Sequence, residues 1–330
     1  SIPALTSSNY NNLTIANTGT KTMAASLTID GTLSISDAAG ILDINGTTLT
    51  LNGSTSLSGN LKGSSTSNLT IGGSGGSSPT IRFNSAATDS LLNTLTLNRT
   101  GGSAGVTLGT NLAITNLVTI TNGDLNLNGK IITLKSTSIT NTTQIGTVGG
   151  TITYNNGSFT VERFIPQGNR AVRDLAVGVN TNSNVYFFDT WQESGGTSGG
   201  LGTHITGKAG ASPGGVDATT GCDMTTSGAT SLWDYVNGVW SSGVTNTKTT
   251  KPNVYKGYRI TVRGDRTFNL YATPPVGMNA ATTLRANGQL VTGTVTYTTS
   301  GITNSGGPST SVTLNTTTTA GRFSLLANPY

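Results

Sequence analysis

Short apolar triplets recur along the first half of the chain, each with an apolar, a small or polar, and a second apolar residue. They return every six to seven residues in the stretch Val106-Thr107-Leu108, Leu112-Ala113-Ile114, Val118-Thr119-Ile120, Leu125-Asn126-Leu127 and Ile132-Thr133-Leu134. Alternation with period two predicts β-strands that bury one face. An antiparallel meander usually spaces its strands by about eight to twelve residues. The tighter spacing therefore favours a solenoid with three short strands per coil.

Asn-Gly and Asp-Gly pairs stand between many of these triplets, as at Asp30-Gly31, Asn45-Gly46, Asn52-Gly53, Asn122-Gly123 and Asn128-Gly129. Such pairs tolerate the left-handed backbone that a sharp corner requires. With about 20 residues per coil, residues 1–158 predict a parallel β-helix of about seven coils. The general rule for parallel crossovers makes it right-handed. The same pairs also mark hairpin turns, so an antiparallel sandwich is the alternative.

The composition changes near Phe159, because residues 159–330 hold all three tryptophans and most of the tyrosines and phenylalanines. Longer alternating runs predict strands at Phe159 to Phe164, Val185 to Phe188, Tyr258 to Val262, Thr267 to Tyr271, Leu290 to Tyr297 and Arg322 to Leu326. No run has a helical period. We therefore predict an all-β chain in which residues 159–330 form an antiparallel, aromatic-cored β-sandwich-like module. Its abrupt end leads us to expect that the module is truncated at the C-terminal end.

Charged residues make up only 9% of the chain, and the net charge of +5 is spread without a run of Lys or Arg. We predict no nucleic-acid partner from this distribution. The single cysteine and single histidine argue against an internal disulfide and a Cys/His zinc site. No cluster of Asp and Glu appears in the repeats, so we predict a non-enzymatic protein without cofactor or metal. No apolar run approaches about 18 residues, so we predict no membrane span.

Candidate binding residues lie in the second half. One hypothesis is a carbohydrate-binding aromatic platform, formed by Trp191, Glu193, Trp233, Tyr235 and Trp240. The alternative is that these rings fill the core of the module. His204 is a candidate ligand-binding residue, and its alternative is a hydrogen-bonded structural role.

Two further patterns suggest functions that we weigh against plainer interpretations. Arg263-Gly264-Asp265 is a tripeptide found in integrin-binding loops. We expect a tight hairpin there, with Gly264 at positive φ and solvated charges on either side. Thr-rich rows on a flat β-helix can bind ice, but the middle residues of these triplets alternate among Thr, Ser, Asp, Ala and Asn. This mixed order disfavours ice binding.

Several segments resemble large β-helical surface proteins of Bacteroidota. In the repeats they are Tyr10 to Ile15, Leu27 to Leu33 and Gly40 to Gly46; in the second half they are Val161 to Pro166, Thr190 to Glu193, Gly202 to Gly207, Tyr258 to Arg266 and Phe323 to Tyr330. The resemblance implies export by the type IX secretion system and a location at the bacterial outer membrane surface or outside the cell. It carries no catalytic residues, and the C-terminal sorting domain of such proteins has no match here.

We therefore expect a non-enzymatic extracellular adhesin or structural stalk. Its expected partners are other surface-protein domains, copies of itself stacked end to end through the open strand edges of the helix, or glycans. The alternative is a secreted carbohydrate-binding protein, with carbohydrate processing less favoured because clustered acids are missing.

Overall fold

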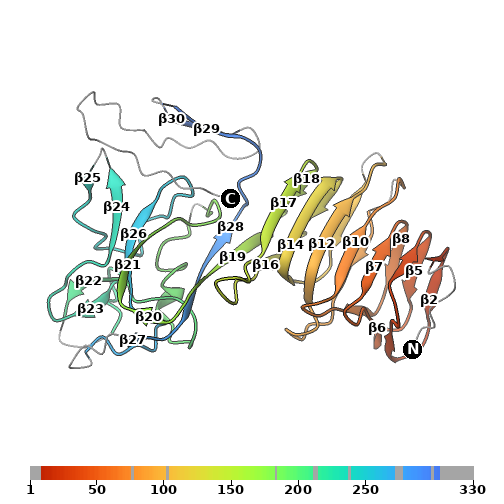
Figure 1. The fold of residues 1–330 in the computed structure, drawn as a ribbon, viewed down its shortest axis with the longest axis horizontal. Helices are drawn as coiled ribbons and strands as arrows, with labels where there is room; N and C mark the ends of the chain where they lie inside the picture. The colour runs from red at the N-terminus through yellow and green to blue at the C-terminus, as the bar shows by residue number, and fades with distance from the viewer. Residues whose placement is uncertain are drawn as a thin grey trace. The chain divides into compact units, whose positions relative to one another are not determined.

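The computed structural model describes residues 9–75, 78–101, 104–182, 184–210, 215–236, 239–271, 278–298 and 301–304. The chain divides into two compact units, the first formed by Ser1–Lys135 and Asn141–Phe159 and the second by Ser136–Thr140 and Thr160–Tyr330. The described residues form strands, turns and one 3-10 turn at Glu193–Gly195, without an α-helix (Figure 1). The strand expected at Arg322 to Leu326 lies outside the described residues.

The first unit is a β-solenoid of about six turns. One sheet contains β1 (Asn9–Tyr10), β4 (Leu27–Ile29), β7 (Thr48–Leu51), β10 (Asn68–Ile71), β12 (Leu91–Asn98), β14 (Leu112–Asn122) and β16 (Ile131–Leu134), with β17 (Gln144–Val148) also beside β14. A second contains β2 (Leu13–Ile15), β5 (Thr32–Ile35) and β8 (Ser54–Leu57), and a third β3 (Gly19–Thr22), β6 (Gly40–Asp43) and β9 (Asn60–Lys62). A fourth contains β11 (Thr80–Ile81), β13 (Gly105–Leu108), β15 (Asp124–Asn126) and β18 (Thr151–Thr153).

Apolar residues of successive coils stack in register inside the solenoid. One column is Leu27, Leu49, Leu69, Leu95 and Val118, and each of its members is at most 2% exposed. The pairing between these strands is parallel throughout. The parallel β-helix expected from the triplets is therefore confirmed, and the antiparallel alternative for this half is wrong. Stacked Leu, Ile and Val fill a narrow interior without needing many aromatic rings.

Most of the coils are longer than the expected 20 residues. Successive members of the Leu27 column are 22, 20, 26 and 23 residues apart, which follows from the residue numbers 27, 49, 69, 95 and 118. The number of turns is accordingly about six rather than seven. Two of the predicted triplets, at residues 112–114 and 118–120, also merge into the single 11-residue strand β14.

A column of threonines stands on the outer side of the same sheet. The middle residues Thr28, Thr50, Thr70, Thr96 and Thr119 pair in register across five strands, and each side chain is half-buried. The mixed order seen along the sequence arises because successive triplets belong to different sheets. Across these five strands the column contains threonine alone, and the terminal strand β1 places Asn9 opposite Thr28.

Corners of the solenoid use the residues that the sequence pattern indicates. Asn45 and Asn128 adopt positive φ values of 52° and 49°, and Gly46 and Gly129 follow them at 71° and 73°. At Gly53 the corner packs so closely that a β-carbon would collide with the backbone carbonyl oxygen of Gly31 in the preceding coil. Glycine is required there by space between coils rather than by its φ angle.

The second unit contains small, mainly antiparallel sheets. The largest has the order β21 (Ala171–Leu175), β26 (Tyr258–Val262), β24 (Leu232–Val236) and β25 (Val239–Trp240). Antiparallel pairs also join β20 (Gly168–Asn169) to β27 (Met278–Asn279) and β29 (Val295–Thr298) to β30 (Gly301–Asn304), whereas β22 (Thr206–Ala209) and β23 (Asp223–Thr225) are parallel. The strands β19 (Ser158–Ile165) and β28 (Thr282–Gly288) are neighbours in one sheet. Antiparallel sheets following a solenoid are thus confirmed.

Two predicted strands are wrong, and a third, Leu290 to Tyr297, is a strand only from Val295 onward. Residues Val185 to Phe188 form turns, because the Asp189 carboxylate accepts the Tyr186 N–H at 3.0 Å and the Thr190 N–H bonds back to the Tyr186 carbonyl. Phe187 still reaches the core, which explains its apolar character. Residues Thr267 to Tyr271 are also turns and irregular backbone.

The Arg263-Gly264-Asp265 segment is likewise not the solvated hairpin that we expected. Gly264 has the expected positive φ of 98°, but Arg263, Asp265 and Arg266 are only 9%, 5% and 3% exposed. The second of the two expected flanking strands is missing, so the segment turns inward after β26. Asp265 and Arg266 bind groups of the interior, the Gly200 N–H and the Asp223 carboxylate respectively, instead of facing water.

Candidate functional site

The candidate aromatic residues separate into two environments. Trp191 is 3% exposed and packs in the core, with its ring centroid 5.4 Å from that of Phe187 and 6.2 Å from that of Tyr258. Trp233, Tyr235 and Trp240 are half-buried and come from the antiparallel sheet of β21, β26, β24 and β25. The structure therefore places Trp191 in the interior and the other two tryptophans on a sheet.

Register assigns these rings to one face of that sheet. Trp233 pairs with Arg259, which pairs in turn with Asp174, while Tyr235 pairs with Trp240. Directly paired residues in an antiparallel ladder project from the same side, and neighbours along a strand project from opposite sides. The alternate positions Leu232 and Ile260 are fully buried. We call Asp174, Trp233, Tyr235, Trp240 and Arg259 the aromatic face.

Arg259 fixes the arrangement of the aromatic face. Its Nε and Nη2 donate to the two carboxylate oxygens of Asp174 at 3.0 and 3.1 Å, and this hydrogen bonding raises the pKa of Arg259. The carbon of its guanidinium also lies 3.9 Å from the ring centroid of Trp240, and the ring centroids of Trp240 and Tyr235 are 5.0 Å apart in an edge-on arrangement. The rings and the ion pair are thus held in place before any ligand arrives.

This combination suits a sugar. A hexose presents a C–H face, which packs on an aromatic ring, and hydroxyl groups, which pair with charged or amide groups. The aromatic face supplies rings beside a guanidinium and a carboxylate, and the side chain of Val172 is 56% exposed on the neighbouring position of β21. A solvated sheet surface with ordered rings of this kind can bind a chain of sugars without enclosing it.

A cavity of about 410 Å³ lies on the other side of β24. Asn180, Asn182, Asn253 and the ion pair of Asp234 with Lys256, 3.6 Å apart, line part of it. Asp234 stands between Trp233 and Tyr235 in the strand and projects from the opposite face. Amide-rich walls of this kind offer hydrogen bonds to hydroxyl groups.

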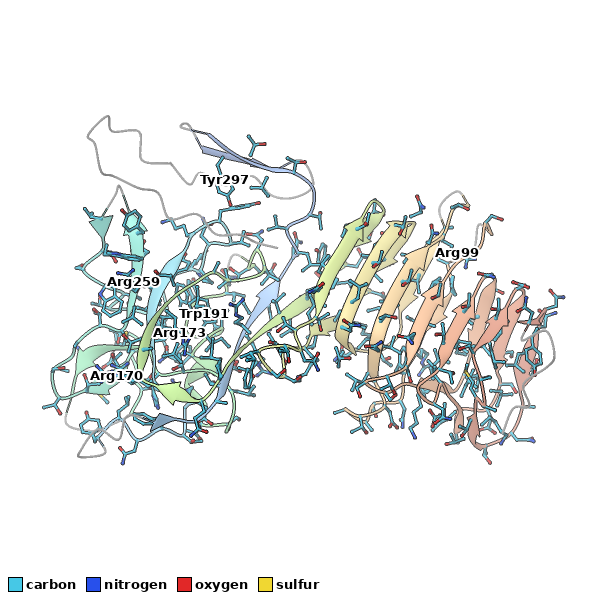
Figure 2. All side chains as sticks on the ribbon, viewed as in Figure 1. Arg99, Arg170, Arg173, Trp191, Arg259 and Tyr297 are labelled. Atoms are coloured by element: carbon cyan, nitrogen blue, oxygen red, sulfur yellow. The ribbon has the colours of Figure 1, made fainter. Side chains whose placement is uncertain are left out.

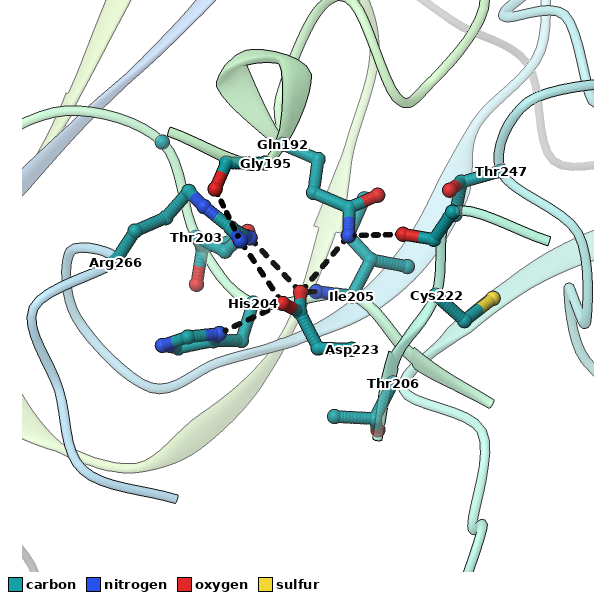
Figure 3. Close-up of polar contacts among 12 residues, drawn as sticks. Gln192, Gly195, Thr203, His204, Ile205, Thr206, Cys222, Asp223, Thr247 and Arg266 are labelled. Carbon is teal, nitrogen blue, oxygen red and sulfur yellow. Dashed lines mark hydrogen bonds and ion pairs between the residues drawn. The ribbon is translucent and has the colours of Figure 1, made fainter. Parts of the chain in front are cut away.

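His204 belongs to a buried polar cluster rather than to the aromatic face (Figure 3). Its Nδ1 lies 3.2 Å from Oδ1 of Asp223, and its Nε2 lies 3.0 Å from the Phe268 carbonyl oxygen. Asp223 is fully buried and also accepts hydrogen bonds from Arg266, from Gln192 Nε2 at 2.9 Å and from the Ile205 N–H at 3.0 Å. A histidine 3% exposed, with both nitrogens beside oxygen atoms of the interior, has the geometry of a structural residue.

Glu193 also lies away from the aromatic face. It adopts a positive φ of 49° in the 3-10 turn and accepts a hydrogen bond of 3.0 Å from Nε of Arg285 in β28. This ion pair joins the turn after Trp191 to β28. We assign Glu193 a role in fixing that turn.

Sequence reasoning missed Asp174 and Arg259. Each is the polar member of an alternating strand, which is a signal for an outward position but not for a site. Their ion pair spans 85 residues. Only the register between β21 and β26 shows that they meet beneath the rings.

Within the part of the chain that the structure describes, no group of three or more His, Cys, Asp and Glu side chains is arranged to hold a metal ion. The described residues also contain no helix with the length and hydropathy of a membrane span. Comparison with protein-family models, with curated proteins and with solved structures finds no match for this chain.

Proposed function

We propose that this protein is a non-enzymatic, adhesin-like carbohydrate-binding protein in which a β-solenoid spacer is joined to a module with a sugar-binding face. The aromatic face is the observation that carries the proposal, because its rings, guanidinium and carboxylate are ordered on a half-exposed sheet surface. Sheet surfaces of this kind bind ligand through stacking and hydrogen bonds rather than through reacting groups.

The solenoid contributes length rather than chemistry. Its core is built from stacked aliphatic residues, and its carboxylates are used in local contacts, such as Asp43 with Lys62 at 3.1 Å and Asp124 with Thr151 at 2.9 Å. A sparsely charged Thr, Ser and Asn surface limits nonspecific charge interactions. These features support the role of a stalk.

A location at the cell surface or outside the cell is part of the same proposal. It is supported by the stalk-like repeats, the low charge and the single buried cysteine, Cys222. Export by the type IX secretion system rests on the sequence resemblance to Bacteroidota surface proteins alone. Partners other than glycans, including further copies of this chain, remain proposals on the same footing.

A glycan-array assay on the whole chain tests the proposal. We expect saturable binding to a subset of polysaccharides, lost in Trp240→Ala and Trp233→Ala while near-ultraviolet circular dichroism shows an intact fold. Tyr10→Ala, which removes a half-buried ring from β1, is the matched control and should bind as the parent does. Binding that survives both tryptophan substitutions would exclude the aromatic face.

The threonine column is a specific observation in favour of a second function, ice binding. Five hydroxyl-bearing side chains repeat at the strand spacing of about 4.8 Å on one parallel sheet. Such a regular row can order water molecules against it. Thermal hysteresis in the parent, reduced by Thr70→Leu at the centre of the column, would support this function; freezing behaviour identical to that of a globular control protein would exclude it.

A further inference from the structure

Arg263 is a buried cation without a bonded partner among the described residues. Arg263 is the residue directly after β26, and it is 9% exposed. Its Nη1 lies out of solvent without a hydrogen-bond acceptor, and no ion pair among the described residues includes this guanidinium. A buried guanidinium donor without an acceptor costs free energy, because its hydration is lost and no hydrogen bond replaces it.

A second arginine adds to the positive charge. Ala171 pairs with Val262, so Arg170 and Arg263 occupy the next position of the β21–β26 ladder. Arg170 is exposed and likewise takes part in none of the ion pairs of the described residues. Burial, together with the charge of Arg170, lowers the pKa of Arg263 to about 10. Like charges that stand opposite each other on paired segments repel each other.

We call these two residues the arginine pair, and no ion pair among the described residues joins either of them to a carboxylate. All 13 Asp and Glu residues lie in the described part of the sequence. Asp223 attracts Arg263 electrostatically, but its oxygens are already held by Arg266, His204, Gln192 and the Ile205 N–H.

Asp265, two residues further along, accepts hydrogen bonds from the Gly200 N–H at 2.6 Å and from the Thr267 N–H at 2.9 Å. Each of its carboxylate oxygens thus already has a backbone donor, and no ion pair among the described residues joins Asp265 to either arginine. Within the described part of the chain, the arginine pair is therefore without a bound carboxylate.

We propose that Arg170 and Arg263 form a binding site for an anionic group, a sulfate, phosphate or carboxylate, on an external ligand. Guanidinium groups bind such oxyanions through paired N–H donors in a matching planar geometry. An oxyanion between the two side chains would remove their repulsion and supply an acceptor for the buried donor. The exposure of Arg170 gives the ligand access from solvent.

The position of the arginine pair relative to the aromatic face indicates which class of ligand the proposed function would involve. Arg259 of the aromatic face and Arg263 are four residues apart along one chain segment, or about 13 Å in extended backbone. Arg259 lies within the β21–β26 ladder, and Arg170 lies just beyond its opposite end, as the labels in Figure 2 show. We infer an acidic polysaccharide, with sugar rings at the aromatic face and a sulfate or carboxylate at the arginine pair; this step rests on the proposed function.

Isothermal titration calorimetry with sodium sulfate and with sodium phosphate tests the anion site directly, at low millimolar concentrations and with ionic strength held constant by chloride. Low concentrations are needed because both salts stabilise proteins nonspecifically when concentrated. We expect saturable binding by the parent and at least tenfold weaker binding by Arg170→Gln and Arg263→Gln. Arg163→Gln removes the same charge at an exposed position of β19 and should bind as the parent does.

Absence of saturable binding, or equal binding by all four proteins, would overturn the anion site. Arg170→Gln decides the matter if Arg263→Gln fails to fold, because Arg170 is exposed. The Arg170→Gln substitution also removes the repulsion between Arg170 and Arg263. We therefore expect this variant to unfold in chloride at a temperature equal to or higher than that of the parent.

Matched neutral and sulfated oligosaccharides separate this inference from the proposed function. Preference for the sulfated form that disappears in Arg170→Gln supports both. Sulfate binding without any oligosaccharide binding keeps the anion site and contradicts carbohydrate recognition. Equal binding of neutral and sulfated forms by the parent and by Arg170→Gln keeps carbohydrate recognition and overturns the acidic-polysaccharide inference.

Discussion

Arg266 holds Asp223 through two parallel hydrogen bonds, both of 2.8 Å, between side chains that are at most 1% exposed. The pair connects the start of β23 to the turn after β26 across 43 residues. The other donors to Asp223, from Gln192 and Ile205, come from two further segments. One carboxylate thus ties together four parts of the second unit that have few regular strands of their own.

Replacing Asp223 by Ala should strongly destabilise the second unit. The substitution leaves Arg266 buried without its carboxylate, and breaking a buried ion pair in this way costs about 3–5 kcal/mol of unfolding free energy. Urea unfolding followed by tryptophan fluorescence measures the change. Asp174→Ala is the control, because it breaks an exposed bidentate pair whose loss costs about 1 kcal/mol or less. Equal losses in the two variants would contradict the central role of Asp223.

Acid should weaken the same cluster. Burial of Asp223 opposes ionisation, but hydrogen bonds from His204 and Arg266 overcome it and lower its pKa below the ordinary value. A carboxyl group whose pKa is lower in the folded state stabilises that state above the pKa of the unfolded chain, about 4. That contribution is lost as the pH falls from about 4 through the folded-state pKa.

The measurement is the urea midpoint between pH 7 and pH 2, in the parent and in Asp223→Asn. We expect the urea midpoint of the parent to decrease once the pH drops below about 4. The urea midpoint of the variant should be lower at pH 7 and should change less between pH 7 and pH 2. Parallel curves would show that other carboxyl groups account for the whole acid response.

The repeats could be predicted from sequence because their signal is local. Leu27, Leu49 and Leu69 each head an alternating triplet, and stacking identical triplets in register buries all of them at once. The purity of the threonine column could not be predicted, because it depends on which triplets share a sheet, and therefore on coil lengths that vary from 20 to 26 residues.

The second unit was less predictable for a related reason. Trp191 and Trp240 are the same residue type in similarly polar sequence, yet one packs in the core and the other on a sheet face. The buried charges around Asp223 contradict the usual interpretation of Arg and Asp as surface residues. Their partners are supplied by contacts across 18 to 71 residues, which no local pattern reveals.

Gly53→Ala should destabilise the solenoid. A β-carbon at this corner would collide with the Gly31 carbonyl of the preceding coil, and backbone cannot move aside as a flexible side chain can. We expect a loss of about 1–3 kcal/mol or more, the usual range for overpacking. Thermal unfolding followed by far-ultraviolet circular dichroism measures it. Gly168→Ala is the control, because a β-carbon there meets nothing within 4 Å; an equal shift would refute the close-packed corner.

Substitutions at Trp191 and Trp240 should separate folding from binding. Trp191 contacts Phe187 and Tyr258 inside the second unit, so Trp191→Ala should cost about 3–5 kcal/mol of unfolding free energy. Trp240 is half-buried on the edge strand β25, and its main contacts are Arg259 and Tyr235 on the aromatic face. Its replacement by Ala should therefore cost much less stability.

The two measurements are urea unfolding and binding to whichever polysaccharide the glycan array identifies. Trp191→Phe, which keeps a ring in the core, should recover most of the stability lost in Trp191→Ala and retain binding. Trp240→Phe should recover part of the binding lost in Trp240→Ala, because a smaller ring still offers a stacking surface. If Trp240→Ala unfolds the protein as severely as Trp191→Ala, the aromatic face is part of the core, and its sugar-binding role fails with it.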